Sequence, residues 1–195
     1  MGVSDVIVGQ LTDAMRVADG TDVDLTRFIH PRIEPEVAFR LARDVDVNDA
    51  LTDLGDAVDA VAPALEIIDS RYRDFRFSLP DVIADNTSAA AFVIGQWQPF
   101  HVSHRTDDIG NLAVELRIDG ALADVGSTAA ILGHPLRALP ALLAMARRNK
   151  IELRAGHVIL AGAATAAAPF TASVVTAHIA RLGTVTVRGV RRSHG

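Results

Sequence analysis

The sequence predicts a single α+β domain with a mixed, largely antiparallel β-sheet and flanking helices. Strand-like apolar runs outnumber helical patterns along the chain, and the two do not alternate regularly as they do in doubly wound folds. The length of 195 residues suits one domain, and 49% hydrophobic with 22% charged residues is typical of a chain that folds around a core. No repeat or flexible linker divides the sequence, so we expect residues 1–195 to form one domain.

The first predicted strand is Ile29–Leu41, which is rich in branched apolar residues. Pro31 and Pro35 lack the amide hydrogen that a strand donates to its neighbour. We therefore expect this strand at an edge of the sheet or at a bulge.

A helix is predicted over Ala50–Val61, because apolar residues recur there at spacings of three and four. Asn48 is a suitable N-cap for this helix, and Pro63 would end it. The apolar runs Ala64–Ile68 and Ala89–Ile94 then predict two short buried strands.

The second half of the chain is predicted to be rich in strands. The Asp119-Gly120 pair predicts a hairpin turn between the strands Leu112–Ile118 and Ala121–Val125. Pro135 opens a helix over Leu136–Arg148, where leucines share one face and arginines occupy the last turn. Three further strands are expected at Val158–Leu160, Ser173–Ile179 and Thr184–Val187.

The composition excludes several classes of site. The chain has no cysteine, which rules out disulfides, zinc–thiolate sites, iron–sulfur clusters and thiol nucleophiles. A P-loop, a dinucleotide-binding glycine fingerprint, a GxSxG elbow and an HExxH motif are absent too. The net charge of −5 argues against a nucleic-acid partner. No secretion signal and no apolar run of about 18 residues is visible, so we expect a cytoplasmic protein without a membrane partner.

Two glutamates on the first predicted strand are candidate metal ligands. Side chains alternate along a strand, so Glu34 and Glu36 project from the same face. Neighbouring carboxylates repel each other, and a divalent cation removes the conflict. An all-oxygen site favours a hard ion, Mg²⁺ or Mn²⁺. The alternative is that both glutamates lie on the solvated face of an edge strand.

A third carboxylate, Glu66, lies inside the apolar run Ala64–Ile68. A buried carboxylate is costly unless it is paired with a cation or bound to a metal. An ion pair with one of the many arginines explains Glu66 as well as metal ligation does, and both interpretations stay open.

Other polar residues give weaker signals. His30 lies close to the acidic pair and is either a proton donor or an ordinary strand residue. The cluster Asp85-Asn86-Thr87-Ser88 precedes an apolar run, and it is explained equally by a turn and by a substrate pocket.

Taken together, these segments resemble the 2-oxo-acid hydratase/decarboxylase branch of the fumarylacetoacetate hydrolase superfamily. His30 before the Pro-Arg-Ile-Glu sequence, and the segment Ser70–Phe77, resemble in particular the decarboxylases of 2-oxohex-3-enedioate (4-oxalocrotonate). The resemblance is carried by the segments Gly9–Met15, Phe28–Phe39, Glu66–Tyr72, Ala84–Ser88, Ala130–Pro135 and Ile159–Gly162.

The resemblance implies a fumarylacetoacetate hydrolase-like roll or barrel of the mixed sheet. It also implies that residues 1–195 correspond to the C-terminal catalytic domain of the family, without the N-terminal helical segment that carries an active-site lysine. In this family Glu34, Glu36 and Glu66 would be the ligands of Mg²⁺ (or Mn²⁺).

The activity implied is that of a Mg²⁺-dependent lyase. It would decarboxylate 2-oxohex-3-enedioate to 2-hydroxypenta-2,4-dienoate in aromatic meta-cleavage catabolism. One alternative is a 2-hydroxypenta-2,4-dienoate (2-keto-4-pentenoate) hydratase, which would use the same metal chelate together with a proton donor. Another is a catalytically impaired family member that acts as a structural partner, because the lysine segment has no counterpart here.

The resemblance also implies roles for residues outside the acidic trio. His30 is the candidate catalytic residue, and Arg71 and Arg76 are the candidates for holding the distal carboxylate of the substrate. The implied partners are a small 2-oxo-enoic acid, further copies of the chain in a homo-oligomer, and a paralogous hydratase. The candidate substrate-binding residues are Ser70, Arg71, Arg76, Asp85 and Asn86.

Overall fold

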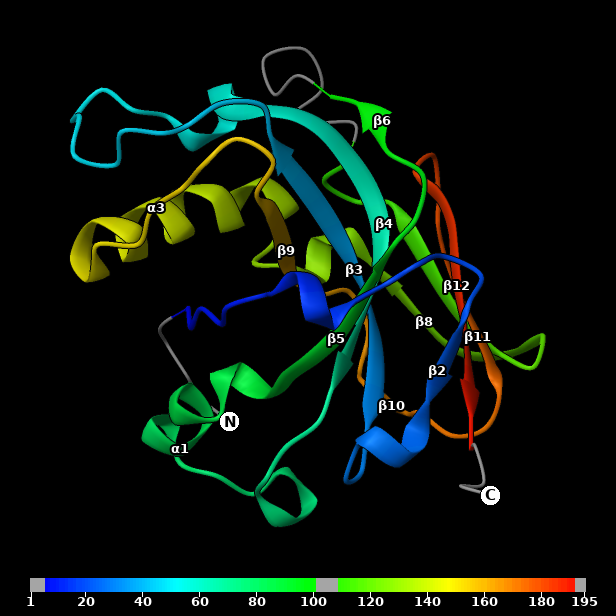
Figure 1. Cartoon of the computed structure of the whole chain (residues 1–195). Helices are drawn as coiled ribbons and strands as arrows, with labels where there is room; N and C mark the ends of the chain where they lie inside the picture. The colour runs from blue at the N-terminus through cyan, green and yellow to red at the C-terminus, as the bar shows by residue number, and fades with distance from the viewer. Residues whose placement is uncertain (1–5, 101–108, 192–195) are drawn as a thin grey trace.

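Two open β-sheets face each other across the main hydrophobic core in the computed structural model, which describes residues 6–100 and 109–191 (Figure 1). The first sheet has the order β1-β5-β4-β3-β10, with β6 also paired to β4 and β9 to β3. Its strands are β1 (Arg16–Val17), β3 (Arg32–Leu41), β4 (Val58–Ile68), β5 (Ala89–Ile94), β6 (Gln98–Pro99), β9 (Val158–Ala163) and β10 (Ala168–Pro169).

The second sheet has the order β2-β12-β11-β7-β8. Only the β1–β5 and β2–β12 pairs are parallel among the pairs of named strands, so the predicted mixed, largely antiparallel α+β fold is confirmed. The sheets are open, whereas a roll or barrel was expected. The strands of the second sheet are β2 (Asp22–Asp24), β7 (Ala113–Ile118), β8 (Ala121–Ser127), β11 (Val174–Ile179) and β12 (Gly183–Val190).

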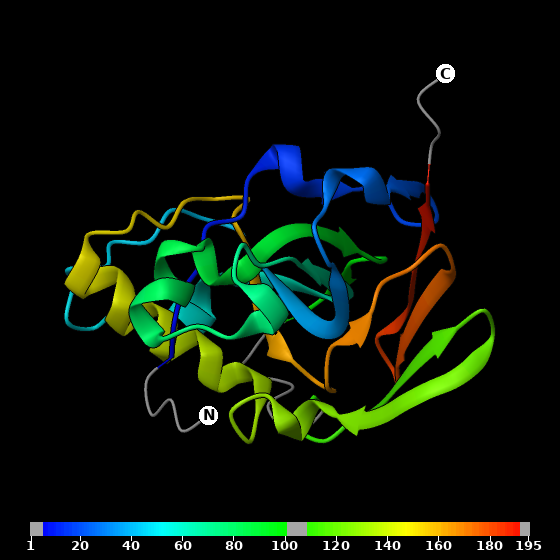
Figure 2. The same cartoon turned by 90° about the horizontal axis from the view of Figure 1, so that it is seen from below.

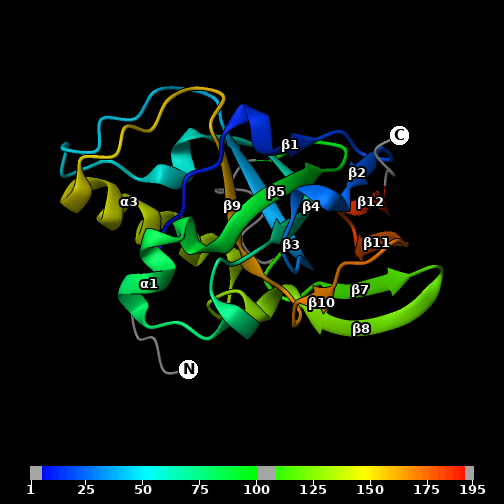
Figure 3. The same cartoon turned by 60° about the horizontal axis from the view of Figure 1, so that its bottom comes forward.

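The two α-helices of the described chain, α1 (Leu79–Ala84) and α3 (Ala138–Asn149), lie at one end of the first sheet. Figures 2 and 3 show the β7–β8 hairpin at the opposite end of the molecule. Short 3₁₀ turns connect many of the elements: η1 (Asp13–Met15), η2 (Leu25–Arg27), η3 (Leu54–Ala57), η4 (Arg73–Phe75), η5 (Asn86–Ser88), η7 (Thr128–Ala130) and η8 (Pro135–Arg137).

One face of the first sheet packs into the core, and the opposite face, the functional face, carries the candidate site. Alternate residues of β3 and β4, such as Ile33 and Leu65, pack against Val175 and Val185 of the second sheet. The intervening residues face the other way, where alanines on β3 and β4 form a small cluster with Phe92. Small side chains on this face leave room above the centre of the sheet.

The predicted C-terminal elements are confirmed. The Asp119-Gly120 turn has two positive φ angles, 50° and 80°, as a tight hairpin turn requires. Helix α3 buries Leu139, Leu143 and Ala146 in the core. It lies within Thr128–Asn149, a stretch that is long and apolar enough to cross a membrane by length and composition only. Here α3 packs one face into the core.

Of the two predicted positions of β3, the edge is wrong, because β3 lies between β4 and the pair β9 and β10. A bulge is present beside Pro35, where the β3–β9 register shifts between Glu36 and Ala38. Pro35 lies where the neighbour of β3 changes: β10 pairs with Ile33, and β9 pairs from Glu36 onward. The Pro35 carbonyl still accepts a hydrogen bond from Ala164 N at 2.8 Å. The missing amide therefore falls at an interruption of the ladder, and a central strand tolerates the proline.

The predicted helix over Ala50–Val61 is also wrong. Its first half is a turn followed by η3, and its last residues begin the central strand β4. Pro63 does not end a helix, since it lies inside β4 between the residues that pair with β6 and those that pair with β5. Both faces of β4 are buried, so apolar residues occur at nearly every position of the strand. The spacing of apolar residues within Ala50–Val61 therefore arises from burial and does not indicate a helix.

Candidate metal centre and substrate cavity

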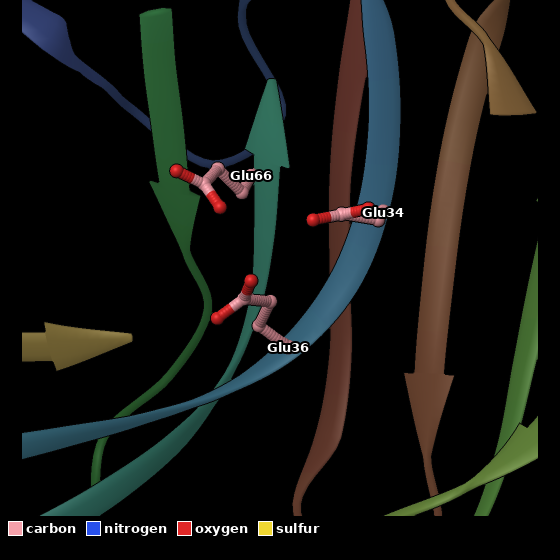
Figure 4. A group of neighbouring side chains, drawn as sticks. All are labelled: Glu34, Glu36 and Glu66. Atoms are coloured by element: carbon pink, nitrogen blue, oxygen red, sulfur yellow. The ribbon is translucent and has the colours of Figure 1, made fainter. Parts of the chain in front are cut away.

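Three carboxylates converge on the functional face of the first sheet (Figure 4). Glu34 of β3 is the direct cross-strand partner of Glu66 of β4, and Glu36 follows on the same face of β3. One oxygen from each side chain lies within 4.8 Å of the others. The period of two along β3 and the register with β4 together build the cluster.

A β-bulge in β9 completes the environment of Glu36. Between two paired positions, β9 has one residue more than β3, and the extra length includes Gly162. Gly162 has a φ of +115°, a backbone conformation that residues other than glycine rarely adopt. Its amide is thereby released from the ladder and donates to Glu36 Oε2 at 2.7 Å.

The cluster is electrostatically unfavourable without a cation. Burial, followed by the charge of Glu66, raises the pKa of Glu34 from 4.5 to about 7. Glu36 is 2% exposed, and burial together with the charges of Glu66 and Glu34 raises its pKa well above the usual range. Burial also raises the pKa of Glu66. Such raised pKa values are typical of a carboxylate cluster that a bound cation would stabilise.

Within residues 6–100 and 109–191, no arginine or lysine forms an ion pair with the cluster. Glu66 therefore has no arginine partner among these residues, and the ion-pair alternative finds no support there. Glu36 is buried, so a solvated edge strand does not explain the acidic pair either. Three oxygen donors at this separation suit a hard divalent ion and leave coordination positions for water or a ligand.

The three glutamates line a cavity of about 700 Å³. Phe92 of β5 lies next to Glu66 in the register and adds an apolar surface to the floor. Residues of α3 and β9, such as Leu142 and Leu160, form apolar walls. The segment of residues 6–13 forms a further wall and brings polar groups to it.

Asn86 fixes the wall formed by residues 6–13. Its Oδ1 accepts from Gln10 N at 2.7 Å, and its Nδ2 donates to Gln10 O at 2.9 Å. Gly9 lies so close to this turn that a Cβ there would be 2.2 Å from Thr87 Oγ1. Asn86, which the sequence indicated as a substrate-binding residue, thus holds the backbone of the cavity wall.

Three other predicted site residues gather in a second polar cluster, beyond the end of the β3–β4 ladder. Ser70 Oγ donates to Asp85 Oδ2 at 2.8 Å, and Arg71 forms an ion pair with the same carboxylate. Burial alone would raise the pKa of Asp85, but the hydrogen bonds from Ser70 and Arg71 hold it below the usual range. None of these three residues lines the cavity, and their roles in binding stay predictions.

His30 belongs to this second cluster too. Its Nε2 lies 2.8 Å from the carbonyl oxygen of Ser70, and its ring stacks on Phe75 at 4.9 Å. His30 does not line the cavity that contains the three glutamates. Arg76 is exposed and does not line the cavity. The catalytic role of His30 and the binding role of Arg76 stay predictions.

Sequence reasoning missed three groups that the cavity brings together. These groups belong to Gly162, Phe92 and Arg16, all of which line the cavity. Arg16 is the cross-strand partner of Phe92 in the parallel β1–β5 pair. Only strand register could have placed Phe92 and Arg16 beside the glutamates, whereas Gly162 was marked by its place in a family-like segment.

Comparison with known proteins agrees with the fold. A 4-oxalocrotonate decarboxylase from Pseudomonas sp. is 50% identical over 168 residues, which cover 86% of this chain and 63% of that protein. A 2-keto-4-pentenoate hydratase from Burkholderia vietnamiensis is 37% identical over 187 residues, or 95% of this chain and 70% of that protein. The chain thus spans under two thirds of the length of the first relative.

The structure of a 4-oxalocrotonate decarboxylase from Pseudomonas putida G7, complexed with magnesium and adipate, superimposes with a TM-score of 0.82 at 32% identity. The match covers 93% of this chain and 69% of that one. Residues 5–189 match the family model of the fumarylacetoacetate (FAA) hydrolase C-terminal region. The chain therefore belongs to the fumarylacetoacetate hydrolase family.

Proposed function

We propose that the chain is a Mg²⁺-dependent carbon–carbon lyase that decarboxylates 2-oxohex-3-enedioate to 2-hydroxypenta-2,4-dienoate in aromatic meta-cleavage catabolism. The observation that carries this proposal is the convergence of three carboxylates, with raised pKa values, on one cavity. Similarity to the 4-oxalocrotonate decarboxylases supports the choice of substrate.

Glu34, Glu36 and Glu66 would hold the ion, Mg²⁺ or Mn²⁺. When bound, such an ion supplies Lewis-acid polarisation of the 2-oxo group of a 2-oxo acid. The protein's own groups prepare the site. The Gly162 amide fixes the orientation of the Glu36 carboxylate, and Phe92 offers an apolar surface to the conjugated carbon chain. Leu142 and Leu160 add apolar walls beside these groups.

Hydration of 2-hydroxypenta-2,4-dienoate is the second candidate activity. It is supported by the 37% identity with a hydratase and by Gln10 and Thr87, polar residues that line the cavity and could hold a water molecule. The products separate the two activities, since a decarboxylase releases CO₂ and a hydratase forms 4-hydroxy-2-oxopentanoate.

We further propose that residues 1–195 form one catalytic domain that works in the cytoplasm as a homo-oligomer. Leu122 and Val125 on the edge strand β8 are 53% and 62% exposed, which supports burial of this strand in an interface. Association with a paralogous hydratase would place consecutive enzymes together. Light scattering of the chain, alone and mixed with such a hydratase, measures both.

The ultraviolet decay of 2-oxohex-3-enedioate, followed with Mg²⁺ and then with EDTA, tests the activity. We expect Mg²⁺-dependent loss of substrate with release of CO₂. Glu34→Gln and Glu66→Gln should each lower the rate at least a hundredfold and keep the fold, because each removes one charged ligand. Glu115→Gln, which alters a surface pair with Arg117 at 2.8 Å, is the matched control and should keep the rate.

Unchanged turnover in EDTA or in either cavity variant would overturn the metal assignment. A folded, Mg²⁺-loaded chain that neither releases CO₂ nor hydrates the dienoate would instead support a catalytically impaired family member.

A further inference from the structure

We propose that Arg16 binds the distal carboxylate of the substrate and thereby selects a six-carbon dicarboxylate over a monoanionic dienoate. The identity of the substrate rests on the function proposed above. The geometry rests on a row of four residues that crosses the first sheet. Glu34, Glu66, Phe92 and Arg16 are successive cross-strand partners on β3, β4, β5 and β1.

Residues paired in this way project from the same face of a sheet, and neighbouring strands lie about 4.8 Å apart. The backbone of Arg16 is therefore about 10 Å from that of Glu66, with Phe92 between them. All four residues line the same cavity. The row thus runs from a carboxylate cluster, across an aromatic ring, to a guanidinium group.

The chemistry of 2-oxohex-3-enedioate follows the same order. Its C1 carboxylate and 2-oxo group form the chelating end, its C3–C5 segment is apolar, and its C6 carboxylate is the far end. Five carbon–carbon bonds of about 1.5 Å separate the two carboxylate carbons by about 6 Å. With the chelating end at the glutamates, the carbon chain lies on Phe92 and the C6 carboxylate points toward β1.

Arg16 is the one permanently charged cation among the described residues that line the cavity. It has no ion-pair partner within residues 6–100 and 109–191. Asp13 lines the cavity near Arg16 and adds negative charge. Because Asp13 would repel a bound carboxylate, an anion at this position needs the positive charge of Arg16. His157 also lines the cavity, but its Nδ1 accepts from Arg154 N at 3.2 Å. Arg71 is already paired with Asp85 outside the cavity.

The reaction sets the kinetic role of Arg16. The C5–C6 bond breaks and C6 leaves as neutral CO₂. The electron pair forms the C4–C5 double bond, the C3–C4 pair moves to C2–C3, and the 2-oxo oxygen gains negative charge and then a proton from solvent. The carboxylate that Arg16 binds therefore loses its charge in the transition state. Arg16 stabilises bound substrate more than the transition state, so it acts on KM and not on kcat.

Binding of adipate and of hexanoate in the presence of Mg²⁺, measured by calorimetry, tests this role without turnover. Arg16→Gln should lower the affinity for adipate about tenfold and leave the affinity for hexanoate unchanged, whereas Arg16→Lys should retain most of the affinity for adipate. Arg43→Gln removes an exposed arginine outside the cavity and is the matched control. Unchanged adipate affinity in Arg16→Gln, with a normal melting temperature, would overturn the proposal.

Steady-state kinetics separates this proposal from the proposed function. For Arg16→Gln we expect a tenfold higher KM for 2-oxohex-3-enedioate with kcat unchanged or higher; a lower kcat at unchanged KM would refute the binding role. If the wild-type chain binds adipate through Arg16 but releases no CO₂, the proposed activity fails and the dicarboxylate site stands. If it releases CO₂ and Arg16→Gln changes neither KM nor adipate affinity, only the role of Arg16 fails.

Discussion

A single backbone amide donates a hydrogen bond to the most buried carboxylate of the site. Glu36 receives its hydrogen bond from Gly162 in a bulge where φ is +115°. This bond lowers the pKa of Glu36 and opposes burial and the neighbouring charges, which raise it. The nearest group to an added Cβ would be Ile131 Cγ2 at 3.8 Å, so the backbone conformation, and not lack of space, demands glycine.

Gly162→Ala should therefore destabilise the fold by about 1–3 kcal/mol and weaken Mg²⁺ binding severalfold, because the backbone must rotate and turn its amide away from Glu36. Chemical unfolding and Mg²⁺ titration measure the two effects. Gly120→Ala is the matched control, since Gly120 has a φ of +80° with open space around it, far from the metal centre. It should cost stability but leave Mg²⁺ affinity unchanged. Equal Mg²⁺ affinity in both variants would contradict the role assigned to the amide.

At the scale of elements, Pro35 and Pro63 mark changes of strand partner and not strand ends. Pro35 lies at the junction of β10 and β9 beside β3, and Pro63 lies at the junction of β6 and β5 beside β4. The carbonyl of each proline still accepts a backbone hydrogen bond, from Ala164 and Gly95 respectively. Both central strands therefore keep their ladders on either side of a proline.

The N-terminal wall of the cavity depends on one side chain. Asn86→Ala removes both hydrogen bonds to Gln10 and places alanine at a φ of 52°, which asparagine adopts more readily. We expect faster hydrogen exchange in residues 6–13 and a three- to tenfold loss of adipate affinity, while Mg²⁺ affinity stays within twofold. Asn149→Ala, which removes a hydrogen bond at the end of α3, should change none of these. Unchanged exchange at Gln10 would show that Asn86 does not hold this wall.

At the scale of the whole molecule, the charge cluster couples stability to pH and to metal. In the metal-free protein Glu34 has a pKa of about 7, against an ordinary value of 4.5 in the unfolded chain. Between these pH values the folded state binds more protons, so the free energy of unfolding falls as pH rises. Below about pH 4.5 this contribution is fully present, and above about pH 7 it is lost.

Urea unfolding in EDTA should thus give lower stability at pH 8 than at pH 5. Saturating Mg²⁺ should stabilise the protein more at pH 8, because protons no longer compete for the carboxylates. Glu34→Gln should flatten the pH dependence of the metal-free protein. A metal-free wild type that is as stable at pH 8 as at pH 5 would contradict the raised pKa.

The sequence by itself determined the elements with strong local signals. The Asp119-Gly120 hairpin and the amphipathic helix α3 follow from turn chemistry and apolar spacing, which act over a few residues. The shared face of Glu34 and Glu36 follows from the alternation of side chains along a strand. Similarity to a known family then joined Glu66 to them.

Only the tertiary structure decided what depends on contacts between distant segments. Burial of β4 on both faces removed the alternation that would have marked it as a strand, so its start was mistaken for a helix. Strand register set Arg16 and Phe92 in line with Glu66, and the bulge at Gly162 turned an amide toward Glu36. Register and bulges arise from pairing across the sheet, which spacing along a single chain does not encode.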